Sequence, residues 1–388
     1  MLADTDAGNV VTAAQAGASW GYRLLPLVLL LIPTLYVVQE LTVRLGIGTG
    51  KGHGELIRER FGAGWACLSM LGLAAAVIGS LVTEFTGVAG VGELYGVPRR
   101  LTLPLAAVFL LAILASRSYR RVERIALAVG LFELAFFAVL WVAHPSLGTV
   151  VRQASDLPLG NAGFLYLGAA VIGAVFNPWM VFYQQSAVAD KGLRAADRAM
   201  ARLDTALGAV LTQLLTGAVL AAAAATLMHG EVPVRLDSIG EISRSLSPIL
   251  GRGAGRFVFS AGVLGASLVT AIVASLALAW GVGEVAGYRR ALEGRPFAGG
   301  VFFAVYAAAV VGAAGLCGVV PDLVRLNIAA QVLNGFLLPL VFGVLVALAA
   351  RAPPAEGRLR GWYLGLVILV CAVVCSAGIV GGIAGWPQ

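Results

Sequence analysis

Two short polar segments interrupt apolar stretches of this sequence and are the places where a ligand could bind. Asp6-Ala7-Gly8-Asn9 lies near the start of the chain, and Asn177-Pro178-Trp179 lies about halfway along it. Hydrocarbon tolerates unpaired backbone groups only where they line a cavity, so a break in an apolar helix indicates a cavity inside a membrane. Two such breaks in corresponding halves of a chain predict a substrate site near the bilayer midplane.

The composition identifies the membrane as the environment of these segments. Of the 388 residues, 59% are hydrophobic and 12% are charged, and the mean hydropathy is +0.90. A soluble domain has roughly 25% charged residues, so a soluble protein is excluded and an integral membrane protein is predicted. The net charge of +7 does not indicate a nucleic-acid partner, because the basic residues follow the loops and form no patch with aromatic residues.

Apolar stretches that match the thickness of a bilayer recur along the chain and predict an all-α, polytopic protein with about eleven transmembrane helices. The predicted spans are 10–22 (incomplete), 24–43, 65–89, 101–115, 125–143, 162–188, 205–228, 257–286, 299–320, 328–350 and 361–384. They leave no room for a soluble domain, so residues 1–388 are predicted to form one transmembrane domain. If two inverted repeats cover about 1–143 and about 162–350, each polar segment falls in the first helix of its repeat, and 361–384 is an extra helix.

The positive charges predict the orientation of the chain. Of the 27 Lys and Arg residues, 18 lie in the loops 44–60, 117–124, 191–202, 289–295 and 351–360. By the positive-inside rule these loops are cytoplasmic, so the prediction is a multi-pass cell-membrane protein with a cytoplasmic N-terminus and an extracellular C-terminus. The lipid bilayer is the expected partner, and a monomer is expected to suffice for function.

The residue types that usually carry catalysis show no useful spacing. The four cysteines lie in apolar segments without a CxxC pair, and the three histidines show no HxxxH or HExxH spacing. No pair of a nucleophile and a base stands out. The sequence therefore predicts neither an enzyme nor a bound cofactor.

The residues around both polar segments form motifs of a known family. They are Asp6 to Ala18, Gly21-Tyr22, Gln39-Glu40-Leu41, Arg44-Leu45-Gly46, Thr49-Gly50-Lys51 and Ala174-Val175-Phe176-Asn177-Pro178-Trp179. These motifs resemble the NRAMP family of divalent-metal transporters, continuously over residues 4 to about 60, again over 166–206, and more weakly in the later helices. The resemblance implies a transporter with the leucine-transporter type of fold, a 5+5 inverted repeat and breaks in helices 1 and 6.

The resemblance also implies the ligands of the transported metal. The Asp and Asn of the family's Asp-Pro-Gly-Asn motif bind the metal, and Asp6 and Asn9 occupy these positions. In the family's Ala-x-x-Met-Pro-His motif the methionine is a soft ligand, and here Asn177 replaces it. An amide oxygen is a hard donor, so this site, completed by the backbone carbonyls of Ala7 and Ala174, is expected to suit Mg²⁺. The exchange is similar to that in the NRAMP-related magnesium transporters.

Two positions that the family uses for proton coupling carry residues that cannot titrate. Trp179 replaces the histidine of the sixth helix, and Gly87 replaces the relay glutamate of the third helix. The expected function is therefore uptake of Mg²⁺, and also of Mn²⁺, as a partly hydrated ion by alternating access without proton coupling. The metal ion is the substrate in this interpretation.

Four further polar side chains in or near the predicted spans are secondary candidates. Glu84 and Glu93 are intramembrane acids, a class that is often functional. We interpret both as structural or vestibule groups rather than proton relays. Gln331 and Asn334 share one face of the predicted helix 328–350, where they could touch the ion's water shell or bond a neighbouring helix.

Three other functions stay open at this point. The first is a proton-coupled Mn²⁺ or Fe²⁺ symporter of the parent family, against which the missing Met and His count. The second is a sodium-coupled organic-solute symporter of the same fold. Asp6 disfavours it, because such sites hold a carboxylate of the substrate and lack a central Asp. The third is a receptor or scaffold that transports nothing.

The position of the first break predicts a short first half-helix. Only five residues precede Asp6, whereas a half-helix that reaches the membrane surface needs about ten to twelve residues. The first half-helix is therefore expected to be truncated in this sequence.

Overall fold

The computed structural model describes residues 6–115, 128, 131–228, 234–236, 238–243, 251–287, 300–351 and 358–385. Within these ranges every regular element is a helix, as predicted. The elements are α1 (Ala7–Trp20), α2 (Leu25–Thr49), α3 (His53–Phe61), α4 (Ala63–Leu94), α5 (Arg99–Ala115), η2 (Leu131–Leu134), α7 (Ala135–Ala143), α8 (Leu147–Ser155), α9 (Ala162–Val175), α10 (Pro178–Asp190), η3 (Ala195–Asp197), α11 (Arg198–Leu227), α13 (Arg252–Ala286), α14 (Gly300–Val319), α15 (Leu323–Arg351) and α16 (Gly361–Gly385).

Eight segments of the described residues are long and apolar enough to cross a membrane. They are Leu25–Thr49, Ala63–Leu94, Ala162–Asp190, Ala195–Thr226, Gly253–Ala286, Gly300–Val319, Leu323–Arg351 and Gly361–Gly385. α1 has 14 residues and α5 has 17, and both are shorter than the 18 residues taken here as the shortest span. Of the predicted span 125–143, residues 125–127, 129 and 130 lie outside the described residues, and η2 and α7 cover 131–143. The number of eleven spans, the repeat boundaries and the orientation of the termini therefore stay predictions.

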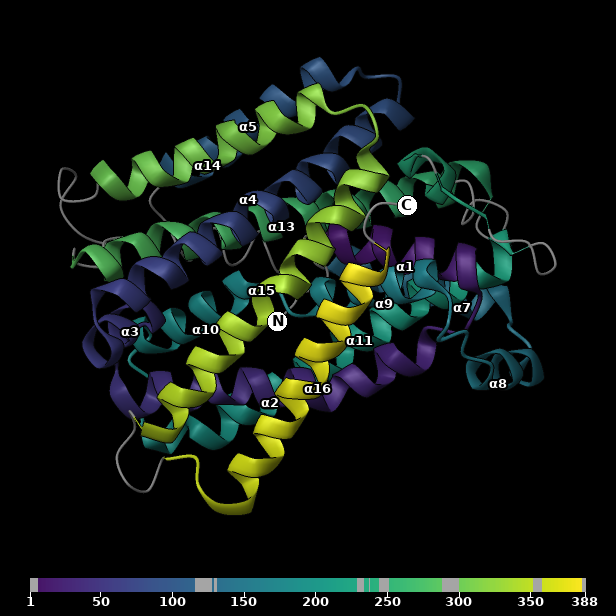
Figure 1. The fold of residues 1–388 in the computed structure, drawn as a ribbon. Helices are drawn as coiled ribbons and strands as arrows, with labels where there is room; N and C mark the ends of the chain where they lie inside the picture. The colour runs from purple at the N-terminus through teal and green to yellow at the C-terminus, as the bar shows by residue number, and fades with distance from the viewer. Residues whose placement is uncertain are drawn as a thin grey trace.

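The helices form two groups that pack against each other. α4, α5, α13 and α14 contact one another and form the upper layers of Figure 1. α1 packs against α9 and α11, while α2 packs against α10 and α11. α15 and α16 lie side by side across α9, and α15 also contacts α4, so it joins the two groups. We call α4, α5, α13 and α14 the scaffold.

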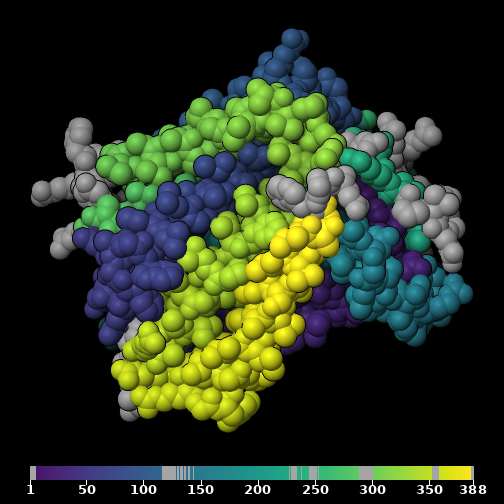
Figure 2. Space-filling view, in the orientation of Figure 1, coloured from purple at the N-terminus to yellow at the C-terminus, as the bar shows by residue number. Residues whose placement is uncertain are grey.

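The outer surface of the model is apolar along several helices. Figure 2 shows one such face, formed largely by α4, α14, α15 and α16. Large hydrophobic side chains are exposed there and on α5, among them Leu71, Leu105, Val311, Leu369 and Val380. This distribution is expected of helices that face lipid, because lipid does not drive apolar side chains into the interior.

A buried carboxylate connects α3 to both groups of helices. Glu284 of α13 accepts a hydrogen bond from Ser186 Oγ of α10 at 2.6 Å and another from the backbone N–H of Gly54 at 2.9 Å. Next to it, Nδ1 of His53 lies 2.7 Å from Oε1 of Gln185. Burial lowers the pKa of His53 to about 4, so the ring is neutral at pH 7. The buried Glu284 therefore links α13 to α10 and α3 through hydrogen bonds.

Candidate metal-binding site

The first polar segment forms the start of α1. Asp6 is the N-cap residue, and its Oδ1 accepts a hydrogen bond from the backbone N–H of Asn9 at 2.5 Å. A carboxylate is favourable at this position, because the first N–H groups of a helix have no partner within it and carry a partial positive charge. Both side chains are buried, with 0% of Asp6 and 2% of Asn9 exposed. The capping pattern therefore holds one carboxylate in the interior of the protein.

The second polar segment separates α9 from α10, which confirms the predicted break. Pro178 has no N–H, so the carbonyl of Ala174 loses the partner that residue i+4 would supply in a continuous helix. Asn177 has an extended backbone, with φ −63° and ψ 124°, and α10 begins directly after it. The Ala174 carbonyl instead accepts bonds from Nδ2 of Asn177 at 3.0 Å and Nδ2 of Asn9 at 3.2 Å. The break thus turns a backbone oxygen toward the start of α1.

These two segments meet, although about 170 residues separate them. Nδ2 of Asn177 donates a hydrogen bond to Oδ2 of Asp6 at 3.1 Å. Four predicted ligand residues, Asp6, Asn9, Ala174 and Asn177, therefore lie in one buried cluster, which we call the break cluster. It offers one carboxylate, two amides and one backbone carbonyl, a donor set that a hard cation prefers.

The fifth predicted ligand, the carbonyl of Ala7, belongs to the first turn of α1. The backbone N–H of Ala7 donates to Oε2 of Glu84 at 3.2 Å. Ala7 opens the first turn of α1, and carbonyls in an α-helix point toward its C-terminal end. The Ala7 carbonyl could therefore reach an ion in the break cluster only if the first turn of α1 unwound.

The secondary candidates divide between the cluster and its surroundings. Asn334 Nδ2 donates to Oδ1 of Asn177 at 2.7 Å and to Oε1 of Gln331 at 3.0 Å, so both α15 amides adjoin the break cluster. Glu84 is buried beneath α1, where it accepts from Ala7. Glu93 does not join them: it is 41% exposed and pairs with Arg99 at 2.8 Å. Nine residues of α-helix place it about 14 Å from Glu84 along the axis of α4.

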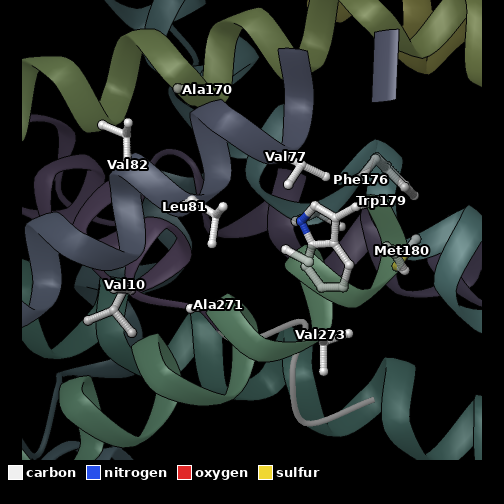
Figure 3. Close-up of a cluster of buried hydrophobic side chains, with 14 of the residues drawn as sticks. Val10, Val77, Leu81, Val82, Ala170, Phe176, Trp179, Met180, Ala271 and Val273 are labelled. Atoms are coloured by element: carbon white, nitrogen blue, oxygen red, sulfur yellow. The ribbon is translucent and has the colours of Figure 1, made fainter. Parts of the chain in front are cut away.

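Trp179 stands at the position where the resemblance implies a titratable histidine, and its side chain is inert and well packed. Its Nε1 donates to Ser80 Oγ of α4 at 3.1 Å, and the ring is fully buried. Figure 3 shows the indole beside Val77 and Leu81, in a cluster of aliphatic side chains. An indole donates one hydrogen bond and takes up no proton near neutral pH. Ser80 was missed in the sequence, where an isolated serine in an apolar stretch gives no signal.

Gly87 lies where three helices approach closely. A Cβ atom on Gly87 would overlap with Oγ of Ser267 on α13 and would lie 2.7 Å from Cβ of Ala7. It would also lie 3.2 Å from Cγ1 of Val263. There is no space for a glutamate side chain at this position without displacing α1 or α13.

Gly87→Ala is expected to lower the free energy of unfolding by about 1–3 kcal/mol, because the added methyl overpacks the contact of α4 with α1 and α13. The measurement is the thermal unfolding midpoint of the purified protein in detergent. Gly79→Ala is the matched control in the same helix, since its Cβ would meet Ala330 Cβ at an ordinary 3.6 Å. Equal midpoints for the two variants would contradict the close approach at Gly87.

Soft metal ligands are not gathered in the part of the chain that the structure describes. No group of three or more His, Cys, Asp or Glu side chains comes together there. Met180 of α10 is the sulfur nearest in sequence to the break, and Nε2 of Gln39 contacts its Sδ at 2.8 Å. The break cluster is therefore an oxygen and amide site.

A third amide continues the polar face of α15. Asn327 lies four residues before Gln331 and seven before Asn334, the spacing of one helix face. The sequence analysis did not select it, although this spacing of amides in an apolar helix could have done so. Its Oδ1 lies 3.4 Å from Thr12 Oγ1 of α1, outside the break cluster.

Comparisons with known proteins match most of this chain to one family. A family model described as "Natural resistance-associated macrophage protein-like" (Nramp) matches residues 1–383. The Divalent metal cation transporter MntH of Erwinia tasmaniensis is 29% identical over 279 residues, which are 70% of this chain and 67% of that relative. The transporter of the same name from Yersinia pestis is 31% identical over 285 residues, which are 71% and 68% of the two chains.

A solved structure has the same fold. The Eremococcus coleocola manganese transporter, in complex with an aromatic bis-isothiourea substituted compound, superposes with a TM-score of 0.78. The match covers 98% of this chain and 84% of that chain at 16% sequence identity. This likeness confirms the predicted leucine-transporter type of fold.

Proposed function

Because the chain belongs to the Nramp family, we propose that it transports divalent metal cations across a membrane, with Mg²⁺ as the preferred ion and Mn²⁺ as a second substrate. The observation that carries the proposal is the break cluster. It combines one buried carboxylate, that of Asp6, with the amides of Asn9 and Asn177 and the carbonyl of Ala174, which has lost its helical partner and accepts from both amides. The Nramp relatives named above are metal transporters, which supports a cation as the substrate.

The preference for Mg²⁺ follows from the chemistry of these donors. Mg²⁺ takes six oxygen ligands, loses its water reluctantly and is usually bound with several waters in place. Four protein oxygens would leave about two positions for water, so the ion would enter partly hydrated. Transition metals gain more from sulfur or imidazole, and the cluster supplies neither.

The transport step in this proposal is alternating access. α1, α9 and α10 carry the ligands and would rock against the scaffold of α4, α5, α13 and α14. The contacts of Ala7 with Glu84 and of Trp179 with Ser80 lie between these two groups. They are therefore the contacts that would change as the site opens.

The membrane potential alone supplies enough energy for uptake. A divalent ion that enters a compartment at −100 mV gains about 4.6 kcal/mol, which corresponds to an accumulation on the order of a thousandfold. Trp179 and Gly87, which cannot carry protons, are consistent with uptake of the ion alone.

Uptake into proteoliposomes with an internal pH indicator tests this proposal. Mg²⁺ uptake is expected to rise when an inside-negative potential is imposed, with no change in internal pH beyond that of protein-free vesicles. Acidification with about one proton per Mg²⁺ would refute uncoupled transport. Vesicles with the Asp6→Ala variant serve as the control for leakage.

The second candidate is a proton-coupled manganese transporter. The solved structure of the same fold, a manganese transporter, favours this alternative. It predicts uptake of Mn²⁺ and Cd²⁺ with internal acidification and little uptake of Mg²⁺. The same vesicles therefore distinguish the two functions.

A further inference from the structure

Three neighbouring amides connect the break cluster to α15. Asn334 Nδ2 donates to Oδ1 of Asn177 at 2.7 Å and to Oε1 of Gln331 at 3.0 Å. The Nδ2 of Asn177 in turn donates to Oδ2 of Asp6 at 3.1 Å and to the Ala174 carbonyl at 3.0 Å. All three amides are buried, with at most 2% of each side chain exposed. They form a continuous chain of hydrogen bonds that ends at the carboxylate.

In this arrangement the Asn177 amide presents its hydrogens to the place where a cation would bind. The NH₂ group of Asn177 lies between Asp6 and the Ala174 carbonyl, and it satisfies both acceptors. An amide nitrogen of this kind cannot coordinate a metal, because its lone pair is delocalised and only the amide oxygen accepts. For Asn177 to coordinate a cation, its amide must therefore turn and present Oδ1.

Two atoms of these three amides have no hydrogen-bond partner among the described residues. They are Nε2 of Gln331 and Oδ1 of Asn334, both buried. A buried polar group without a hydrogen-bond partner is unfavourable, because it has given up its bonds to water. The polar atoms are therefore paired at Asp6, whereas two of those on α15 are not.

Rotation of all three amides would reverse the direction of the hydrogen bonds between them. Asn177 Nδ2 and Gln331 Nε2 would both donate to Oδ1 of Asn334, so the two atoms that are now unpaired would gain partners. Asn334 Nδ2 and Gln331 Oε1 would take over as the atoms without a partner among these three amides. Oδ1 of Asn177 would then turn toward Asp6 and the Ala174 carbonyl. Gln331 Oε1 would face Gly8, where a Cβ atom would overlap the present Nε2 and lie 3.1 Å from Asp6 Oδ1.

We propose that Asn177, Asn334 and Gln331 reverse together when a cation binds, so that Asn334 is a positioning residue that sets whether the break cluster offers donors or acceptors. The inference rests on the proposed cation site and adds a residue that acts through Asn177. In the structure the Asn177 amide satisfies the Asp6 carboxylate, and on binding the ion would take the place of that amide hydrogen.

A double-mutant cycle tests the role of Asn334. Asn334→Leu has a similar volume and no polar atoms, so it removes the partner that holds the turned Asn177 amide. Mg²⁺ affinity, measured by isothermal titration of the purified full chain, is expected to fall about tenfold when Asn334→Leu is introduced into the wild type. In the Asn177→Met background the same change is expected to alter Mg²⁺ affinity by less than about twofold, because no amide is left to position.

The controls separate this inference from the proposed function. Asn327→Leu removes an amide from the same face of α15 that bonds Thr12, and it is expected to leave Mg²⁺ affinity unchanged. If Asn334→Leu lowers affinity equally in both backgrounds, the positioning role of Asn334 is refuted while the cation site stands. If the wild type binds neither Mg²⁺ nor Mn²⁺, the proposed function itself fails. Should Asn334→Leu not fold, Asn334→Ala replaces it in the same cycle with the same expectations.

Discussion

Asp6→Ala is expected to abolish uptake of Mg²⁺ and Mn²⁺ into proteoliposomes and to lower the affinity for either ion by at least about a hundredfold. Asp6 provides the carboxylate of the break cluster, and its side chain is completely buried. With an effective dielectric constant of about 20, a dication 4 Å from one negative charge gains about 8 kcal/mol. Most of that attraction disappears with the carboxylate. Ion-flux assays and isothermal titration measure the two effects.

A second variant distinguishes loss of the ligand from loss of the fold. Alanine at position 6 also removes the N-cap of α1, which costs about 1 kcal/mol of stability. Asp6→Asn keeps an oxygen for the N–H of Asn9 but carries no charge, so it is expected to retain the unfolding midpoint and to lose uptake. Asp156→Asn removes a carboxylate that is 70% exposed and is expected to transport normally. Transport by Asp6→Asn at the wild-type rate would exclude Asp6 as a ligand.

Asn177→Met is expected to reverse the metal preference. The variant should lose about tenfold or more in Mg²⁺ affinity and gain affinity for Mn²⁺ and Cd²⁺, because a thioether is a soft ligand that Mg²⁺ does not use. The change also removes the bonds from Asn177 to Asp6 and Ala174 and leaves Nδ2 of Asn334 with one acceptor fewer. Isothermal titration with each of the three ions measures the change.

A matched variant isolates the contribution of sulfur. Asn177→Leu has a similar shape but no donor atom, so it is expected to lose Mg²⁺ affinity without gaining affinity for Cd²⁺. If both variants keep the wild-type order of affinities, Asn177 does not contact the ion and the preference must come from elsewhere in the cluster.

Several features of the site follow from local sequence alone. Pro178 cannot donate a backbone hydrogen bond, so a break before it and an Ala174 carbonyl without its helical partner are predictable from the sequence. That Asp6 caps α1 and accepts from the backbone N–H of Asn9 came only from the structure. The long apolar stretches likewise predict most of the helices, because a helix satisfies the backbone within one segment and these stretches have the length of helical spans.

The contacts between helices could not be predicted in the same way. Glu84 and Glu93 are both acidic residues of α4, but one accepts a bond from Ala7 and the other pairs with Arg99 at the end of the helix. Which of them adjoins the site depends on where α1 crosses α4. The sequence also contains no indication that Gly87 is pressed between α1 and α13.

The sequence by itself determined the membrane-embedded helical class, the break before Pro178 and the chemical type of the donors, because proline and apolar length act within a few residues of themselves. Only the tertiary structure decided that Asp6 meets Asn177 and that Asn334 bonds to Asn177. It also decided that Ser80 receives the Trp179 indole. Those pairings depend on the rotation and crossing of packed helices, which are set by contacts among residues far apart in the chain.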